Sequence, residues 1–169
     1  MIRYFLISLA VVLFDQSSKI GVKSFFDYHI SIDILGTFLK FTYIENPGIV
    51  FGLEVNSIFY YLITFLSICI AIYICFLIIE LYYEEKENKI ILLSFSLILG
   101  GAVGNLIDRF FVIFKLFNYH GVIDFIDIGF GTYRFYIFNI ADTSVTIGIL
   151  LFIYYNYFID NYKEQNTVE

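Results

Sequence analysis

The stretch SIFYYLITFLSICIAIYICFLIIEL, residues 57–81, holds one charged side chain, Glu80, among its 25 residues. A helix needs about 20 consecutive apolar residues to cross the roughly 30 Å hydrocarbon core of a bilayer. This stretch is long enough and apolar enough to do so. It predicts a membrane-spanning helix, and with it a chain that folds in lipid.

The composition of the whole chain agrees with this interpretation. Of its 169 residues, 60% are hydrophobic and 21% are aromatic, whereas a soluble domain is about 45–50% apolar. The net charge of -6 gives no basic surface for a nucleic acid, so we expect no nucleic-acid partner.

Three further stretches meet the length requirement for a span. They are about residues 2–22, 89–111 and 137–159. The charged connection YYEEKENK, residues 82–89, is short, so the second and third spans are expected to form an antiparallel hairpin. We predict a single integral-membrane domain over residues 1–169, an all-α membrane protein with four transmembrane helices and a small β portion.

The two longer connections, residues 23–56 and 112–136, alternate apolar and polar positions and contain β-branched and aromatic residues. This pattern is typical of short strands, so we expect a β-rich cap on one face of the bundle. Outside the polar motifs, each side of the predicted bundle carries four Lys or Arg residues. The positive-inside rule therefore does not decide the orientation.

Polar side chains lie in or beside these spans, where an ionisable group costs at least about 2.5–3.5 kcal/mol. They form five clusters: Asp15 with Lys19; Asn46 with Gly48; Asn105, Asp108 and Arg109; Asp124 with Asp127; and Asn139 with Asp142. Because successive helices alternate in direction, the last four clusters are expected at one end of the bundle, where the first span also ends. The sequence therefore predicts one polar site there.

Several clusters also have a structural explanation. Asn46 precedes Pro47 and Gly48, so it can belong to an ordinary turn. Asp15 and Lys19 are four residues apart and can form an ion pair on one helix face, and Asp108 can pair with its neighbour Arg109. Asn139 can cap a helix that begins beside it, with Asp142 favoured by the helix dipole.

Asp124 and Asp127 are three positions apart in a strand-like segment, so their side chains should face opposite sides. We expect one of them to point into the bundle and the other to meet water. Two carboxylates close together cannot both ionise easily, so one keeps a proton. This is the chemistry of aspartic proteases, which need neither a metal nor a covalent intermediate.

Five motifs resemble those of one family in their order and spacing: FDQSSK, NPGIVF, GGAVGNLIDR, GVIDFIDI and FNIADTSVTIG, over about residues 14–148. The family is lipoprotein signal peptidase, or signal peptidase II. The resemblance implies a membrane aspartyl endopeptidase that removes the signal peptide from bacterial prolipoproteins, just before a diacylglyceryl-modified cysteine.

The resemblance also implies roles for single residues. The catalytic pair would be Asp124 and Asp142. Substrate-binding residues would be Asn46, Gly48, Asn105, Arg109 and Asn139, and supporting residues would be Asp15, Lys19 and Asp108. No metal and no cofactor are implied. The partners would be prolipoproteins and membrane lipid. The protein would be a monomer in the bacterial inner membrane. Both termini would lie in the cytoplasm, and the cap and active site would lie on the extracytoplasmic face.

Three other functions remain open at this stage. A small-solute transporter can place Asp and Asn at interrupted helices, although it usually shows mid-span carboxylates and a repeat between its halves. A metal-dependent lipid-head-group transferase would need Asp124, Asp127 and Asp142 as Mg²⁺ ligands. A non-catalytic scaffold would need no polar cluster at all.

Overall fold

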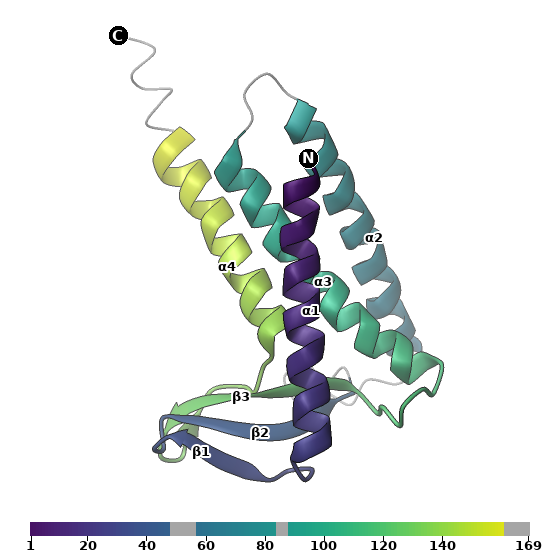
Figure 1. Cartoon of the computed structure of the whole chain (residues 1–169), viewed down its shortest axis with the longest axis vertical. Helices are drawn as coiled ribbons and strands as arrows, with labels where there is room; N and C mark the ends of the chain where they lie inside the picture. Colours follow the sequence, from purple (N-terminus) through teal and green to yellow (C-terminus); the bar gives the residue numbers. More distant parts are fainter. Residues whose placement is uncertain (48–56, 84–87, 161–169) are drawn as a thin grey trace.

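The computed structural model describes residues 1–47, 57–83 and 88–160, with four α-helices above a small sheet (Figure 1). The helices are α1 (Ile2–Phe25), α2 (Ser57–Tyr83), α3 (Lys89–Ile113) and α4 (Ile140–Tyr154), and a π-helix (Tyr155–Asp160) continues α4. As predicted, α2 and α3 run antiparallel. The N-terminus and the end of the π-helix lie at the end of the bundle away from the sheet.

The sheet comes from the two connections in which strands were predicted. It contains β1 (Ser31–Leu35), β2 (Leu39–Asn46), β3 (Val122–Phe130) and β4 (Tyr133–Arg134). The strands are antiparallel in the order β1-β2-β3-β4. Because β2 and β3 are neighbours, the segment after α1 is joined to the segment after α3. Their register pairs Ile44 with Asp124.

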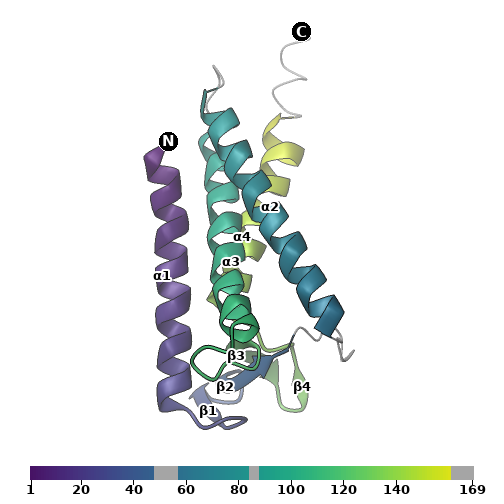
Figure 2. The same cartoon turned by 90° about the vertical axis from the view of Figure 1, so that its right-hand side faces the viewer.

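Helix α3 is the centre of the bundle, and the other three helices pack against it. Figure 2 shows α2 leaning away from α3 toward its sheet-side end. Small residues let two of the helices approach α3 closely. A Cβ atom on Gly101 would collide with the carbonyl oxygen of Ala141 in α4, and one on Gly104 would lie 2.7 Å from Oδ2 of Asp15 in α1.

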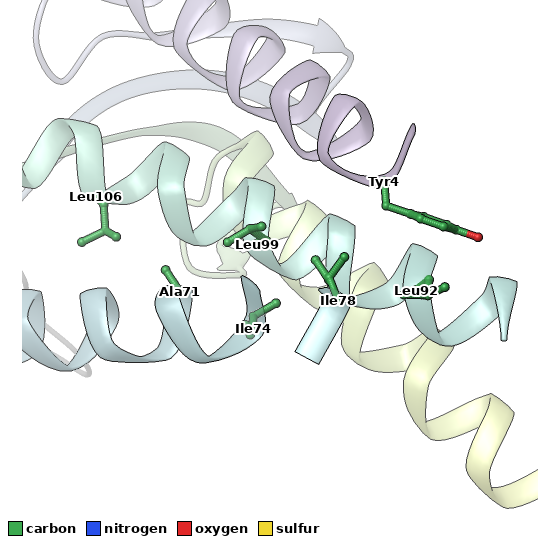
Figure 3. Close-up of a cluster of buried hydrophobic side chains, with 7 residues drawn as sticks. All are labelled: Tyr4, Ala71, Ile74, Ile78, Leu92, Leu99 and Leu106. Carbon is green, nitrogen blue, oxygen red and sulfur yellow. The ribbon is translucent and has the colours of Figure 1, made fainter. Parts of the chain in front are cut away.

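The apolar core lies along the contact of α3 with α1 and α2 (Figure 3). Its buried residues are Tyr4, Ala71, Ile74, Ile78, Leu92, Leu99 and Leu106. Large apolar side chains also cover the outside of the helices, among them Leu13 in α1 and Phe65 and Phe76 in α2. An exposed apolar surface of this extent indicates contact with lipid.

Within the described residues, three helices are long and apolar enough to cross a membrane: Ile2–Phe25, Ile58–Tyr83 and Lys89–Ile113. The protein is therefore a multi-pass membrane protein. The helices α1 and α3 end slightly later than the predicted limits of 22 and 111.

The predicted fourth span, 137–159, does not begin where the sequence suggested. Phe138 instead pairs with Ile126 of β3, and Asn139 is the N-cap of α4. The α-helix itself has 15 residues, which is shorter than a span usually needs.

Candidate active site

A fully buried lysine lies where α1 meets α3. The Nζ atom of Lys19 is 2.8 Å from Oδ2 of Asp15 and 2.9 Å from Oδ2 of Asp108, and it donates to Oδ1 of Asn105 at 2.9 Å. An ammonium group has three N–H donors, so each of them has an acceptor. The predicted ion pair of Asp15 with Lys19 is confirmed. Asp108 pairs with Lys19 and not with its neighbour Arg109, which the sequence suggested as its partner.

The two aspartates of this cluster also hold backbone groups of other elements. Oδ1 of Asp15 accepts a hydrogen bond from the N–H of Ala141 in the first turn of α4, at 2.9 Å. Oδ2 of Asp108 accepts one from the N–H of Ile123 in β3, at 3.1 Å. Gln16 donates to the other oxygen of Asp108 at 3.0 Å. The cluster therefore fixes the start of α4 and the start of β3 relative to α1 and α3.

The start of α4 carries the capping arrangement that the sequence allowed. Oδ1 of Asn139 accepts from the N–H of Asp142 at 2.9 Å, and the N–H of Asn139 donates to Oδ2 of Asp142 at 3.2 Å. Asn139 is also fully buried, and its Nδ2 atom donates to Oδ1 of Asp124 at 2.7 Å. One side chain thus caps the helix and connects Asp142 to the aspartate of β3.

Two more asparagines reach the same pair of carboxylates. Nδ2 of Asn105 donates to Oδ1 of Asp142 at 2.8 Å, and Nδ2 of Asn46, at the end of β2, donates to Oδ2 of Asp124 at 3.3 Å. The structure therefore brings Asp124, Asp142, Asn46, Asn105 and Asn139 together, as the sequence predicted for one polar site.

The environment of Asp124 favours its protonated form. The residue is 3% exposed, and this burial, followed by the neighbouring charge of Asp142, raises the pKa of Asp124 to about 7. Hydrogen bonds from Asn46 and Asn139 act in the opposite direction, because they stabilise the ionised carboxylate. At neutral pH the site can therefore hold one proton and one negative charge, which is the state that acid–base chemistry on a carbonyl needs.

Asp127 lies on the other face of β3, as its spacing from Asp124 predicted. The expectation that it meets water is wrong, because the residue is 7% exposed and its side chain forms an ion pair with Arg134 at 2.8 Å. Thr42 donates to its Oδ2 atom at 3.1 Å. Asp127 is thus turned away from Asp124 and Asp142, which weakens the lipid-head-group transferase alternative, since that enzyme needs all three as metal ligands.

Arg109 lies one helical turn beyond Asn105 on the same face of α3. Its guanidinium carbon is 5.8 Å from the ring centre of Tyr60 in α2. Sequence reasoning missed Tyr60, because one tyrosine within a long apolar helix carries no local signal. Gln16 was missed as well, although it stands beside Asp15 in the first motif. Gly48 lies outside the described residues.

Comparison with known proteins identifies the family of this chain. The family model described as signal peptidase (SPase) II matches residues 7–158. The chain belongs to the signal peptidase II family. This family consists of aspartic-type endopeptidases, in agreement with the paired carboxylates.

Relatives of the signal peptidase II family match nearly the whole chain. A lipoprotein signal peptidase of Desulforapulum autotrophicum is 36% identical over 163 residues, covering 92% of this chain and 91% of the relative. One from Listeria welshimeri is 37% identical over 161 residues, covering 95% and 96%.

Two solved structures described as bacterial membrane enzymes also share the fold. One has a TM-score of 0.75 at 31% identity and covers 94% of this chain and 95% of its own. The other has a TM-score of 0.72 at 29% identity and covers 100% and 93%.

The buried cation makes a first prediction. Lys19→Met leaves the carboxylates of Asp15 and Asp108 buried without their cation, and breaking such a pair costs about 3–5 kcal/mol. Thermal unfolding in detergent at neutral pH should show a large loss of stability. Lys40→Met is the control, because the pair of Lys40 with Asp33 is partly exposed and worth at most about 1 kcal/mol. Equal shifts in the two variants would contradict the prediction.

Proposed function

We propose that this protein removes the signal peptide from bacterial prolipoproteins by cleaving just before the diacylglyceryl-modified cysteine, with Asp124 and Asp142 as the catalytic pair. The observation that carries the proposal is the convergence of these two carboxylates on Asn139, which hydrogen-bonds to both residues, with the pKa of Asp124 raised to about 7 by burial and by Asp142. The names of the relatives, lipoprotein signal peptidase, support the choice of substrate.

In the proposed reaction the pair shares one proton, which the burial of Asp124 favours on that residue. Asp142 takes a proton from a water molecule as the water oxygen attacks the scissile carbonyl carbon. Asp124 donates its proton to the carbonyl oxygen, and a tetrahedral intermediate forms. The intermediate collapses as the C–N bond breaks and the leaving nitrogen takes the proton held by Asp142. The carboxylate of Asp124 recovers its proton from the intermediate.

The polar groups around the pair then divide into two kinds. Asn139 and Asn105 donate to the aspartates themselves, so we assign them mainly to holding the pair in place, beside any contact with the peptide. We assign contact with an extended peptide to Asn46, which also donates to Asp124 at the longer distance of 3.3 Å, and to Arg109 on the α2 side of α3. Gly48 follows Asn46 in the chain and belongs to the same motif. The supporting residues are Asp15, Lys19 and Asp108, which hold the start of α4 and the start of β3 in place.

The lipid on the substrate has a physical role in this proposal. A diacylglyceryl group keeps the modified cysteine at the surface of the membrane. The catalytic pair lies where the helices meet the sheet, at the end of the spans, which is the corresponding depth. We therefore expect membrane lipid to present the substrate to a monomeric enzyme.

Cleavage itself is the direct test. The purified protein in detergent should cleave a diacylglyceryl-modified prolipoprotein, but not its unlipidated form, with and without a chelator, as followed by gel shift. Asp124→Asn and Asp142→Asn should each lower kcat by at least about a hundredfold, since each removes an acid or a base.

Asp127→Asn is the matched control for these variants. It changes a carboxylate on the same strand that faces Arg134, so kcat should stay close to that of the unmodified protein. Near-normal cleavage by Asp124→Asn or Asp142→Asn would exclude the proposed mechanism, and activity lost with the chelator would favour the transferase.

The pH dependence of cleavage follows from Asp124. Because its pKa is raised to about 7, the proton of the pair is present below this pH, and kcat/KM should fall as the pH rises through about 7. Asn46→Ala removes a hydrogen bond that stabilises the ionised form, so the pKa rises and the alkaline limb should move to higher pH. Asp33→Asn, in exposed β1, should leave the limb in place. A limb that moved to lower pH in Asn46→Ala would contradict this assignment.

We also propose that α4 and its π-helix form a fourth span. The 15 residues of α4 and the six of the π-helix together reach the length of about 20 residues that a span needs. The first residues of α1 and the last of the π-helix lie at the same end of the bundle. We place that end in the cytoplasm, with the sheet and the catalytic pair on the extracytoplasmic face of the inner membrane.

Cysteine labelling tests this topology. In a Cys69→Ser, Cys75→Ser background, Asp33→Cys in the sheet should react with an impermeant maleimide on intact spheroplasts. Arg3→Cys, at the opposite end of α1, should react only after the membrane is permeabilised. The reverse pattern would place the sheet in the cytoplasm.

A further inference from the structure

Two buried polar atoms keep unused hydrogen-bonding capacity. In the part of the chain that the structure describes, the buried side-chain atoms without a hydrogen-bond partner are Nη1 of Arg109 and the hydroxyl oxygen of Tyr60. Tyr60 is only 8% exposed. Buried polar groups are nearly always hydrogen-bonded, and each exception calls for an explanation. Two such exceptions on facing side chains indicate that a partner from outside the chain completes them.

The pair lies beside the catalytic site. Asn105 and Arg109 are one turn apart on the same face of α3. Asn105 reaches Asp142 of α4 at 2.8 Å, whereas Arg109 lies over the ring of Tyr60 in α2. The helices α2 and α4 both pack on α3. Tyr60 therefore faces a residue of α3 that lies one turn from the asparagine in contact with Asp142.

The chemistry of the pair selects an oxygen acceptor. A guanidinium group donates and cannot accept, and a tyrosine hydroxyl can donate. Beside Tyr60, the side chains of Phe59 and Tyr61 are exposed on the lipid-facing surface of α2. In a prolipoprotein, the oxygen acceptors near the cleaved bond are peptide carbonyls and the ester carbonyls of the diacylglyceryl group.

We propose that Tyr60 and Arg109 together bind one carbonyl oxygen of the substrate next to the modified cysteine. This inference rests on the proposed function and adds Tyr60 as a substrate-binding residue. The hydroxyl of Tyr60 has no partner in the free protein and gains one when the substrate is bound. Substrate binding is therefore sensitive to this hydroxyl, whereas the stability of the free protein is not.

Tyr60→Phe tests the proposal, because it removes the hydroxyl and keeps the ring over Arg109. Tyr61→Phe is the matched control, since Tyr61 is the next residue of α2 and is 55% exposed. One hydrogen bond corresponds to a rise in KM of about threefold to tenfold. Tyr60→Phe should show this rise with its unfolding temperature unchanged or slightly higher, and Tyr61→Phe should match the unmodified protein.

Two substrates identify the carbonyl. Each variant is assayed with a diacylglyceryl-modified prolipoprotein peptide and with its dialkylglyceryl analogue, whose ether links have no carbonyl. An effect of Tyr60→Phe on the ester substrate alone assigns the ester carbonyl. An equal effect on both substrates assigns a peptide carbonyl.

Unchanged KM for Tyr60→Phe with both substrates would overturn the inference and leave the proposed function standing. A lower unfolding temperature with an unchanged KM would overturn it too, because the hydroxyl would then be structural. If the unmodified protein cleaved neither lipidated peptide, the proposed function itself would fail, and this inference with it.

Discussion

The site depends on the interactions of the ammonium group of Lys19 with its three acceptors. This group is completely buried in the first helix, and its three donors hold Asp15, Asp108 and Asn105. A charge in this position is tolerated only when it is fully paired. Its partners in turn hold the backbone of Ala141 and Ile123, so one cation sets where α4 begins and where β3 enters the bundle.

Asparagine side chains connect the ion cluster to the catalytic carboxylates through hydrogen bonds. An amide both donates and accepts, and both ends of Asn105 and Asn139 are in use. Asn105 accepts from Lys19 and donates to Asp142, and Asn139 accepts from the backbone of Asp142 and donates to Asp124. Two acidic side chains from a strand and a helix are thereby held together without a second cation between them. Burial, followed by the charge of Asp142, still raises the pKa of Asp124 to about 7, although Lys19 and the hydrogen bonds from Asn46 and Asn139 act to lower it.

Much of this arrangement could be predicted from the sequence, because it depends on local spacing. The lengths of the apolar stretches predicted the three long helices, and the four-residue separation of Asp15 and Lys19 predicted their ion pair. Contacts between distant segments could not be predicted in this way. The pairing of Lys19 with Asp108 needs α1 and α3 side by side, and the burial of Asp127 needs Arg134 folded back from β4. The start of α4 was placed too early, since Phe138 is apolar in sequence but pairs with β3.

The close contacts at Gly101 and Gly104 hold α4 and α1 more tightly against α3 than α2 is held. At these positions α3 meets α4 and α1 with no room for a side chain, and buried ions join the same three helices. Turning α1 against α3 would break the ion pair of Lys19 with Asp108, and turning α4 would break the hydrogen bond from the N–H of Ala141 to Asp15. Helix α2 meets α3 through apolar side chains such as Ala71 and Ile74 and through the ring of Tyr60. We therefore expect α1, α3 and α4 to move as one unit, with α2 as the helix that shifts most easily against them.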